Sequence, residues 1–263
     1  MKILKWLLIS ALAAAILVWG AWAIVLPESV LRDLIETPRG DISAKTEGLS
    51  KGLFFDFGAD AITLIRQDKE ILTIENIEGR INPLSLLLLK VALRVEGDLS
   101  GGRFAGSATL HRKGISAAIS VSDADASGIA FLSSLGVVER GTLSGDLTLK
   151  DGVGEARFSL DGALLKDRVF SGVPLPLHLF RGAKAALSVK AGTLGVTSFS
   201  LEGEGIYARI KGDIKGTNLD LNVELMPEAA FRDKIYLIPL ERYMVSPGYY
   251  LIPVKGDLAS SVG

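Results

Sequence analysis

The chain of 263 residues contains no cysteine and only two histidines. Without cysteine it has no disulfide framework, no thiolate nucleophile and no cysteine that could carry a lipid. Neither His111 nor His178 has a second histidine or a cysteine nearby at metal-ligand spacing, so we expect no metal site. We interpret His178, in an apolar stretch, as a partly buried, hydrogen-bonded side chain. Packing alone must stabilise the fold, and the chain is long enough to bury a core.

The chain also lacks a surplus of positive charge and the common catalytic signatures. Its net charge of −1 argues against a surface for nucleic acid. Neither a Gly-x-Ser-x-Gly elbow nor a phosphate-binding loop occurs, so we expect no enzyme activity, no catalytic residue and no cofactor. Residues 123–128 match the start of a calcium loop, but position 12 is Ser134 where a carboxylate is needed. A solvated turn is therefore favoured over a calcium site.

The longest apolar run covers Ile3–Leu26, and Lys2 and Lys5 are the only charges in the first 26 residues. A membrane-spanning helix needs roughly 20 apolar residues, and positive charges tend to stay on the cytoplasmic side. We therefore predict a transmembrane anchor over residues 1–26 with a cytoplasmic amino terminus, and an exported domain over residues 27–263.

Tryptophans near both ends of this run support an anchor, because aromatic rings settle at the two headgroup regions. They are Trp6 at one end and Trp19 and Trp22 at the other. The alternative is a signal peptide cleaved after Ala23, which closes a small-x-small tripeptide. Both interpretations place the rest of the chain outside the cytoplasm.

Apolar and polar residues alternate through much of the remaining sequence, which is typical of strands buried on one face. The residues that we expect on a buried sheet face or in an apolar groove are Leu219, Leu221, Val223, Leu225, Ile206 and Ile210. Alternation cannot separate a closed core from an open groove that holds lipid. The fold predicted is mostly β: an antiparallel sheet of repeated hairpins, either a curved open sheet or a sandwich.

One hairpin is predicted over residues 61–74, where two apolar stretches flank a polar run. Helix is scarce, with short candidates at residues 84–89, at residues 129–135 closed by Gly136, and at residues 228–237 opened by Pro227. The tetrapeptides that begin at Glu96, Ser144, Lys211 and Lys255 all read x-Gly-Asp-Leu/Ile. We interpret their glycines as bulge or turn positions, not as a ligand site.

Together with the anchor and the repeated Gly-Asp hairpins, three further stretches make the chain resemble the type II secretion system protein N (GspN) family. They are Ile77–Leu86, which reads IEGRINPLSL, the Gly101-Gly102 turn, and Tyr249–Leu258, which reads YYLIPVKGDL. The chain is also similar to the wider AsmA-like group of anchored, β-rich periplasmic proteins. Both resemblances imply a single-pass protein of the bacterial inner membrane with most of its chain in the periplasm.

The two resemblances imply different functions. The first implies a non-enzymatic component or accessory of the type II secretion system, which acts by contact with other secretion components. The second implies a module that binds or transfers phospholipid by holding acyl chains on an apolar sheet face. Co-purifying phospholipid would distinguish the second function from the first.

Overall fold

A computed structural model describes residues 19–20, 22, 27–38, 40–112, 114–170, 173–190, 193–216, 218–229 and 240–257. Most of the apolar run Ile3–Leu26, including Trp6, lies outside these residues, as does most of the helix predicted at residues 228–237. Among the residues described, no helix is both long and apolar enough to cross a membrane.

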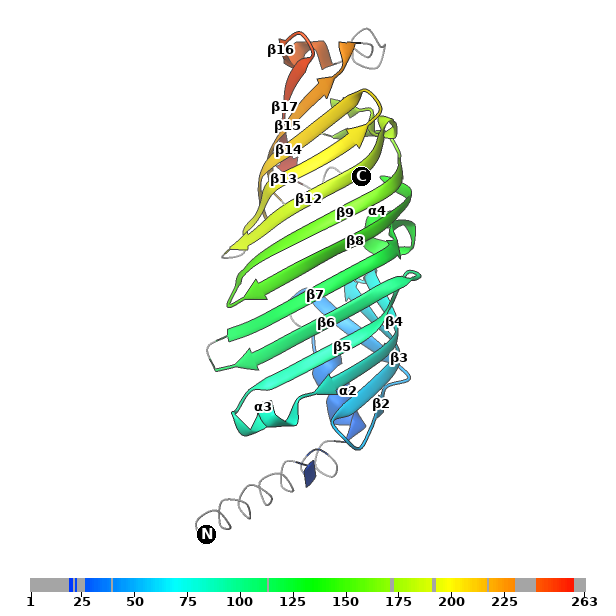
Figure 1. Cartoon of the computed structure of the whole chain (residues 1–263), viewed down its shortest axis with the longest axis vertical. Helices are drawn as coiled ribbons and strands as arrows, with labels where there is room; N and C mark the ends of the chain where they lie inside the picture. The colour runs from blue at the N-terminus through cyan, green and yellow to red at the C-terminus, as the bar shows by residue number, and fades with distance from the viewer. Residues whose placement is uncertain are drawn as a thin grey trace, which may run out of the picture. The chain divides into compact units, whose positions relative to one another are not determined.

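The chain forms one open antiparallel sheet of 15 strands (Figure 1). Of the two architectures predicted, the open sheet is therefore confirmed. Along the sheet the order is β1-β3-β4-β5-β6-β7-β8-β9-β12-β13-β14-β15-β17-β16, with β2 paired to β3. The strands are β1 (Ile42–Glu47), β2 (Ser50–Lys51), β3 (Asp56–Arg66), β4 (Lys69–Ile81), β5 (Val91–Leu99), β6 (Gly102–His111), β7 (Gly114–Asp125), β8 (Val138–Lys150), β9 (Val153–Leu165), β12 (Phe180–Lys190), β13 (Thr193–Gly203), β14 (Ile206–Lys215), β15 (Asn218–Pro227), β16 (Met244–Ser246) and β17 (Tyr249–Asp257).

The helices that the structure describes are short. They are α2 (Glu28–Glu36), α3 (Pro83–Leu87), η2 (Ala126–Gly128), α4 (Ala130–Ser134) and η3 (Leu177–Leu179). Two of them, α3 and α4, confirm predicted helices, and Gly136 after α4 has the positive φ of 60° expected of a C-cap. A separate hairpin pairs β10 (Arg168–Phe170) with β11 (Val173–Leu175).

The chain divides into two compact units. The first contains the residues up to Leu99 together with Arg103–Ile119. The second contains Ser100–Gly102 and the residues from Ser120 onward.

In the first unit, β3 and β4 form the predicted hairpin around a turn at Gln67 and Asp68. Its apolar pairs include Ile62 opposite Ile74. Asn76 has a positive φ of 49° beside a register shift between β4 and β5. Such an extra residue reverses the alternation of side chains, and it lets Ile74 and Ile77 both be buried.

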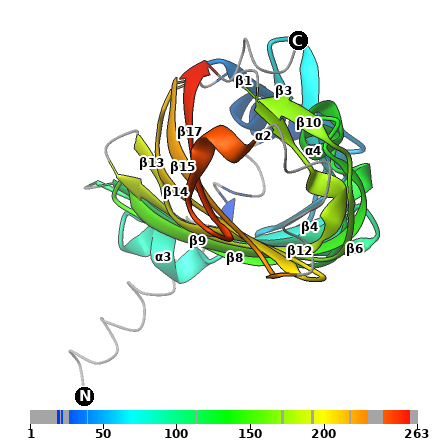
Figure 2. The same ribbon diagram turned by 90° about the horizontal axis from the view of Figure 1, so that it is seen from above.

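In the second unit, β8, β9, β12, β13, β14, β15 and β17 pair in this order, and one end of this sheet carries a buried core. In Figure 2 strands β12 to β17 curve around the short helical turn at residues 240–243, drawn in orange. Leu240, in that turn, is fully buried beside Ile252 and Phe180. The sheet is therefore apolar on the inner side of its curve.

The glycines of the Gly-Asp repeats lie inside strands and not at turns, which corrects part of their interpretation. Gly97, Gly145, Gly212 and Gly256 belong to β5, β8, β14 and β17. A Cβ on Gly145 would lie 2.4 Å from the carbonyl oxygen of Arg157 on the neighbouring strand. At Gly97, Gly145 and Gly212 a side chain is excluded because the backbone of the neighbouring strand is too close.

Candidate apolar site on the second unit

Four successive rows of apolar residues cross seven neighbouring strands of the second unit. The strand registers align them in the order β8, β9, β12, β13, β14, β15 and β17. Row 1 is Leu143, Leu160, Ala183, Leu201, Ala208, Leu225 and Tyr250; row 2 is Gly145, Phe158, Ala185, Phe199, Ile210, Val223 and Ile252; row 3 is Leu147, Ala156, Leu187, Val196, Gly212, Leu221 and Val254; row 4 is Leu149, Gly154, Val189, Leu194, Ile214, Leu219 and Gly256. We call these four rows the apolar face.

The apolar face has no charged side chain, and the hydroxyl of Tyr250 is its one side-chain hydrogen-bonding group. Alternate residues on the same strands point to the other side of the sheet, where charges and serines prevail. There Lys184 Nζ lies 3.1 Å from Glu202 Oε1, and Lys255 Nζ lies 3.3 Å from Asp220 Oδ1. The sheet is thus polar on one side and apolar on the other.

Rows 1 and 2 are largely covered. On β12 to β17, all members of row 1 belong to a buried cluster that also contains Leu165, Leu177 and Leu240. In row 2, Val223 and Ile252 belong to this cluster, and Phe199 and Ile210 pack against it. Ile252 and Leu240 are completely shielded from solvent. This part of the apolar face is a closed core.

Rows 3 and 4 contain a portion that is not closed. Six large apolar side chains lie outside the buried cluster and are half-buried: Leu147, Leu149, Leu187, Val189, Leu194 and Ile214. Their partial exposure shows that no layer of the described residues closes over them. We call these six residues the open portion of the apolar face.

The dimensions of the open portion suit a hydrocarbon chain. Its residues lie in two adjacent rows over five neighbouring strands, from β8 to β14, so at about 4.8 Å per strand they extend roughly 19 Å across the strands. The hydrocarbon of one bilayer leaflet is about 15 Å deep, half of the ~30 Å core. An acyl chain of that length fits along the open portion when it runs across the strands.

The structure brings together all six residues predicted for an apolar face. Leu219, Leu221, Val223 and Leu225 follow one another on β15, and Ile210 pairs with Val223. Ile206 pairs with Pro227, one row beyond row 1. Of these residues Leu221 and Ile210 are half-buried, and the others are buried.

Sequence reasoning did not find the contributions of β12 and β13. In β13 an extra residue lies between Val196 and Phe199, so the alternation of apolar residues is interrupted. In β12 the apolar residues Ala183, Ala185 and Leu187 do occupy alternate positions. The pattern is weak because alanine is small and only slightly hydrophobic.

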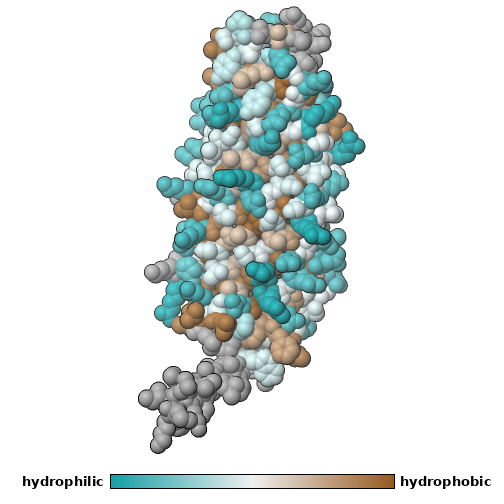
Figure 3. Space-filling view, viewed as in Figure 1, coloured by the Kyte–Doolittle hydropathy of each residue, from teal (hydrophilic) through white to brown (hydrophobic). Residues whose placement is uncertain are grey.

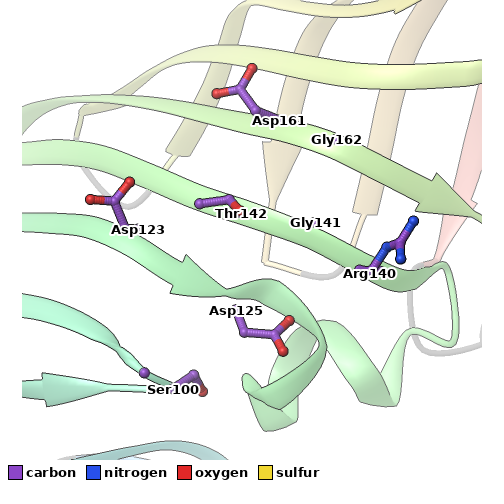
Figure 4. A pocket seen from close by; sticks show the side chains of 9 residues that line it. Ser100, Asp123, Asp125, Arg140, Gly141, Thr142, Asp161 and Gly162 are labelled. Carbon is purple, nitrogen blue, oxygen red and sulfur yellow. The ribbon is translucent and has the colours of Figure 1, made fainter.

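A polar hollow of about 610 Å³ also lies in the second unit, lined by carboxylates from neighbouring strands and by Arg140 (Figure 4). The carboxylate of Asp125 accepts hydrogen bonds from the backbone N–H and the hydroxyl of Ser127, at 2.9 and 2.8 Å. The predicted solvated turn is therefore confirmed. Over the described part of the chain, no three histidine, aspartate or glutamate side chains are grouped so as to hold a metal ion.

His178 is more exposed than predicted, with 46% of its side chain accessible, whereas its predicted hydrogen bonding is confirmed. Its Nδ1 lies 2.7 Å from Asp167 Oδ1, and its backbone N–H donates to the same oxygen. Burial raises the pKa of Asp167, but the hydrogen bonds from His178 outweigh it and hold that pKa below the usual range. Both side chains of this pair are about half exposed.

Two of the three tryptophans predicted to flank an anchor are described. Trp19 is 41% exposed, whereas Trp22 is 5% exposed and stacks on Phe55 with ring centroids 5.4 Å apart. Trp22 therefore packs against the first unit of the protein itself.

Comparison of the chain with protein-family models, with curated proteins and with solved structures gives no match.

Proposed function

We propose that this protein binds lipid acyl chains on the apolar face of its second unit, as a protein anchored in the bacterial inner membrane with this unit in the periplasm. The single observation that carries the proposal is the open portion of that face. It presents six large aliphatic side chains to solvent, with no charge among them and no covering layer in the described part of the chain.

The energetics favour an apolar occupant over water. Burial of each methylene contributes about 0.8 kcal/mol, so ten methylenes contribute about 8 kcal/mol before the entropy of association is subtracted. The open portion has no hydrogen-bonding side chain and therefore offers nothing to a polar ligand. Phospholipid and fatty acid share the chemistry that this face accepts.

The first test compares two substitutions at neighbouring positions of β12. Leu187→Asp places a charge in the open portion, whereas Ala186→Asp places the same charge on the opposite face, where Arg157 is its cross-strand neighbour. We expect Leu187→Asp to lower the lipid that is extracted from the purified full chain, and Ala186→Asp to leave it unchanged. The measurement is quantitative lipid mass spectrometry after organic extraction.

Any lipid held by the amino-terminal apolar run is present in both variants, so it does not affect the difference in lipid content between them. Equal lipid content in the two variants, with circular dichroism showing both folded, would remove the support for this function.

A second candidate function is docking to other proteins, and the position of β1 as an edge strand favours it. The strand order places β1 at one end of the sheet, and an edge strand can pair with a strand of a partner. On the resemblance described above, we propose components of the type II secretion system as the partners.

Substitution of Ala44 tests this edge. Thr46 N–H donates to Glu36 Oε1 at 2.9 Å, so it points away from β3, and by alternation Ala44 N–H points the same way. Ala44→Pro removes an outward donor without removing a hydrogen bond to β3. We expect it to abolish co-purification of secretion components from bacterial cells, whereas Ala44→Val retains them. Undiminished co-purification with Ala44→Pro would contradict docking at this edge.

A further inference from the structure

Two segments of the first unit that carry apolar residues, the loop before β3 and helix α3, lie at the same end of its sheet. Asp56 at the start of β3 pairs with Arg80 near the end of β4. Beyond this pair Ile81 N–H donates to the carbonyl of Phe55 at 2.7 Å. The loop before β3 and helix α3 after β4 are therefore neighbours.

Large apolar side chains on these segments are strongly exposed. The exposed fractions are 64% for Leu53, 70% for Phe54, 68% for Leu84 and 69% for both Leu88 and Leu89. We call these five residues the apolar rim. In Figure 3 brown surface gathers over α3, at the lower left of the view shared with Figure 1. Single exposed leucines are ordinary on a protein surface, but a contiguous group marks an interaction site.

The backbone holds the rim in place. Asn82 Oδ1 accepts a hydrogen bond from Leu84 N–H at 3.0 Å and so caps α3, while Lys90 N–H donates to Ser85 O at 2.9 Å. Leu89 has a positive φ of 55°, a conformation that glycine adopts without strain and leucine does not. A leucine at such a position suggests that its exposed side chain has a use.

The end of the amino-terminal apolar run docks beside the rim. Trp19 Nε1 donates to the carbonyl of Leu53 at 3.2 Å, and Trp22 Nε1 donates to that of Gly52 at 3.0 Å. Lys51 Nζ donates to the Trp22 carbonyl and lies 5.0 Å from the centre of its ring. Two residues of the run Ile3–Leu26, which has the length of a membrane span, thus contact this surface.

We propose that the apolar rim lies in the interfacial layer of the bilayer that takes up the amino-terminal run. The continuity of the rim with that run makes a lipid bilayer its occupant. The half-exposed ring of Trp19 and the exposed side chain of Lys90 suit the boundary between acyl chains and headgroups. Positive charge at that depth also suits anionic headgroups. The inference rests on the membrane anchor of the proposed function, but not on acyl-chain binding by the second unit.

The absence of cysteine makes a site-specific test possible. Leu88→Cys and Phe54→Cys each place one thiol in the rim, and Val153→Cys places one at a 55% exposed valine of the second unit as the control. Each full-length variant is labelled with an NBD fluorophore and reconstituted into vesicles of phosphatidylcholine and phosphatidylglycerol. Emission and quenching by lipids with a nitroxide on the acyl chain are then measured.

We expect blue-shifted NBD emission and several-fold stronger nitroxide quenching at positions 88 and 54 than at position 153. All three side chains are exposed, so the substitutions preserve the fold, and circular dichroism of each variant verifies this. Water-like emission at positions 88 and 54, with quenching no stronger than at position 153, would overturn the proposal. That outcome would leave the lipid content of the Leu187→Asp and Ala186→Asp variants unaffected, so the two proposals fail separately.

Discussion

Single glycines determine how closely neighbouring strands approach in this sheet. A Cβ on Gly212 would lie 2.1 Å from the carbonyl oxygen of Asp220, and the φ of Gly212 is 141°. A Cβ on Gly182 would instead make an ordinary contact of 3.5 Å. Gly212 also occupies row 3 of the apolar face between Val196 and Leu221. Its missing side chain therefore permits both the close strand approach and a smooth apolar surface.

The carboxylate of Glu36 connects α2 to the edge strand β1. It accepts hydrogen bonds from the hydroxyl and the backbone N–H of Thr46, and these bonds hold the pKa of Glu36 below its usual range. A pKa that folding lowers stabilises the folded state above the unfolded pKa, and this contribution is lost as pH falls through the folded pKa. Attachment of α2 should therefore weaken in acid.

We expect Glu36→Gln to speed amide exchange over residues 42–47 at pH 7, because a neutral amide accepts more weakly than a carboxylate. The difference from the unmodified protein should vanish at a pH below the folded pKa of Glu36. Hydrogen–deuterium exchange mass spectrometry of the full chain measures it. Glu47→Gln is the control, because Glu47 pairs with Lys45 on the surface and accepts no backbone bond in the described contacts. Exchange at pH 7 that is equal in Glu36→Gln and the unmodified protein would contradict this role.

Among the elements, tight hairpin turns connect successive strands. The turn between β3 and β4 consists of Gln67 and Asp68, with φ of 51° and 60°. That between β8 and β9 consists of Asp151 and Gly152, with φ of 52° and 83°. Positive φ at both positions is the type I′ geometry that matches the twist of the strands. The second turn has the favoured Asp-Gly sequence, and the first does not.

This contrast predicts opposite effects of two substitutions on the free energy of unfolding. Gly152→Ala should lower the free energy of unfolding by about 1 kcal/mol, because alanine is strained at positive φ. Asp68→Gly should raise the free energy of unfolding by about 0.5 kcal/mol. The strain that glycine relieves in the folded state exceeds the stabilisation of the unfolded chain by its added entropy. Equilibrium urea unfolding of the full chain in mild detergent measures both. A neutral Gly152→Ala would show that the turn adapts its backbone.

The strands that could be predicted from the sequence are those with regular alternation. The run from Leu219 to Leu225 predicts β15 and its buried face, and the polar run around Gln67 predicts its hairpin. The extra residue in β13 and the positive φ of Asn76 break the alternation, and neither leaves a local signal. Which part of the apolar face is closed depends on Leu240 and other residues distant in sequence. The open portion could not be separated from the core without the structure.

At the scale of the whole molecule, an open antiparallel sheet with one apolar side needs something to shield that side from water. Soluble sheets bury such a face against helices or a second sheet. In the second unit the described helices η2, α4 and η3 pack mainly against β8 and β9. The six half-buried residues of the open portion extend from β8 to β14. Acyl chains from lipid are the cover that we propose for them.

Photo-crosslinking at single positions tests this claim most directly. A benzoylphenylalanine is incorporated in bacterial cells in place of Leu187, on the open portion, or in place of Ala186, on the opposite face. The protein is irradiated before purification, and its intact mass is then measured. The account predicts a phospholipid or fatty-acid adduct at position 187 and none at position 186. Equal adduct formation at both positions, or no lipid adduct at position 187, would contradict it.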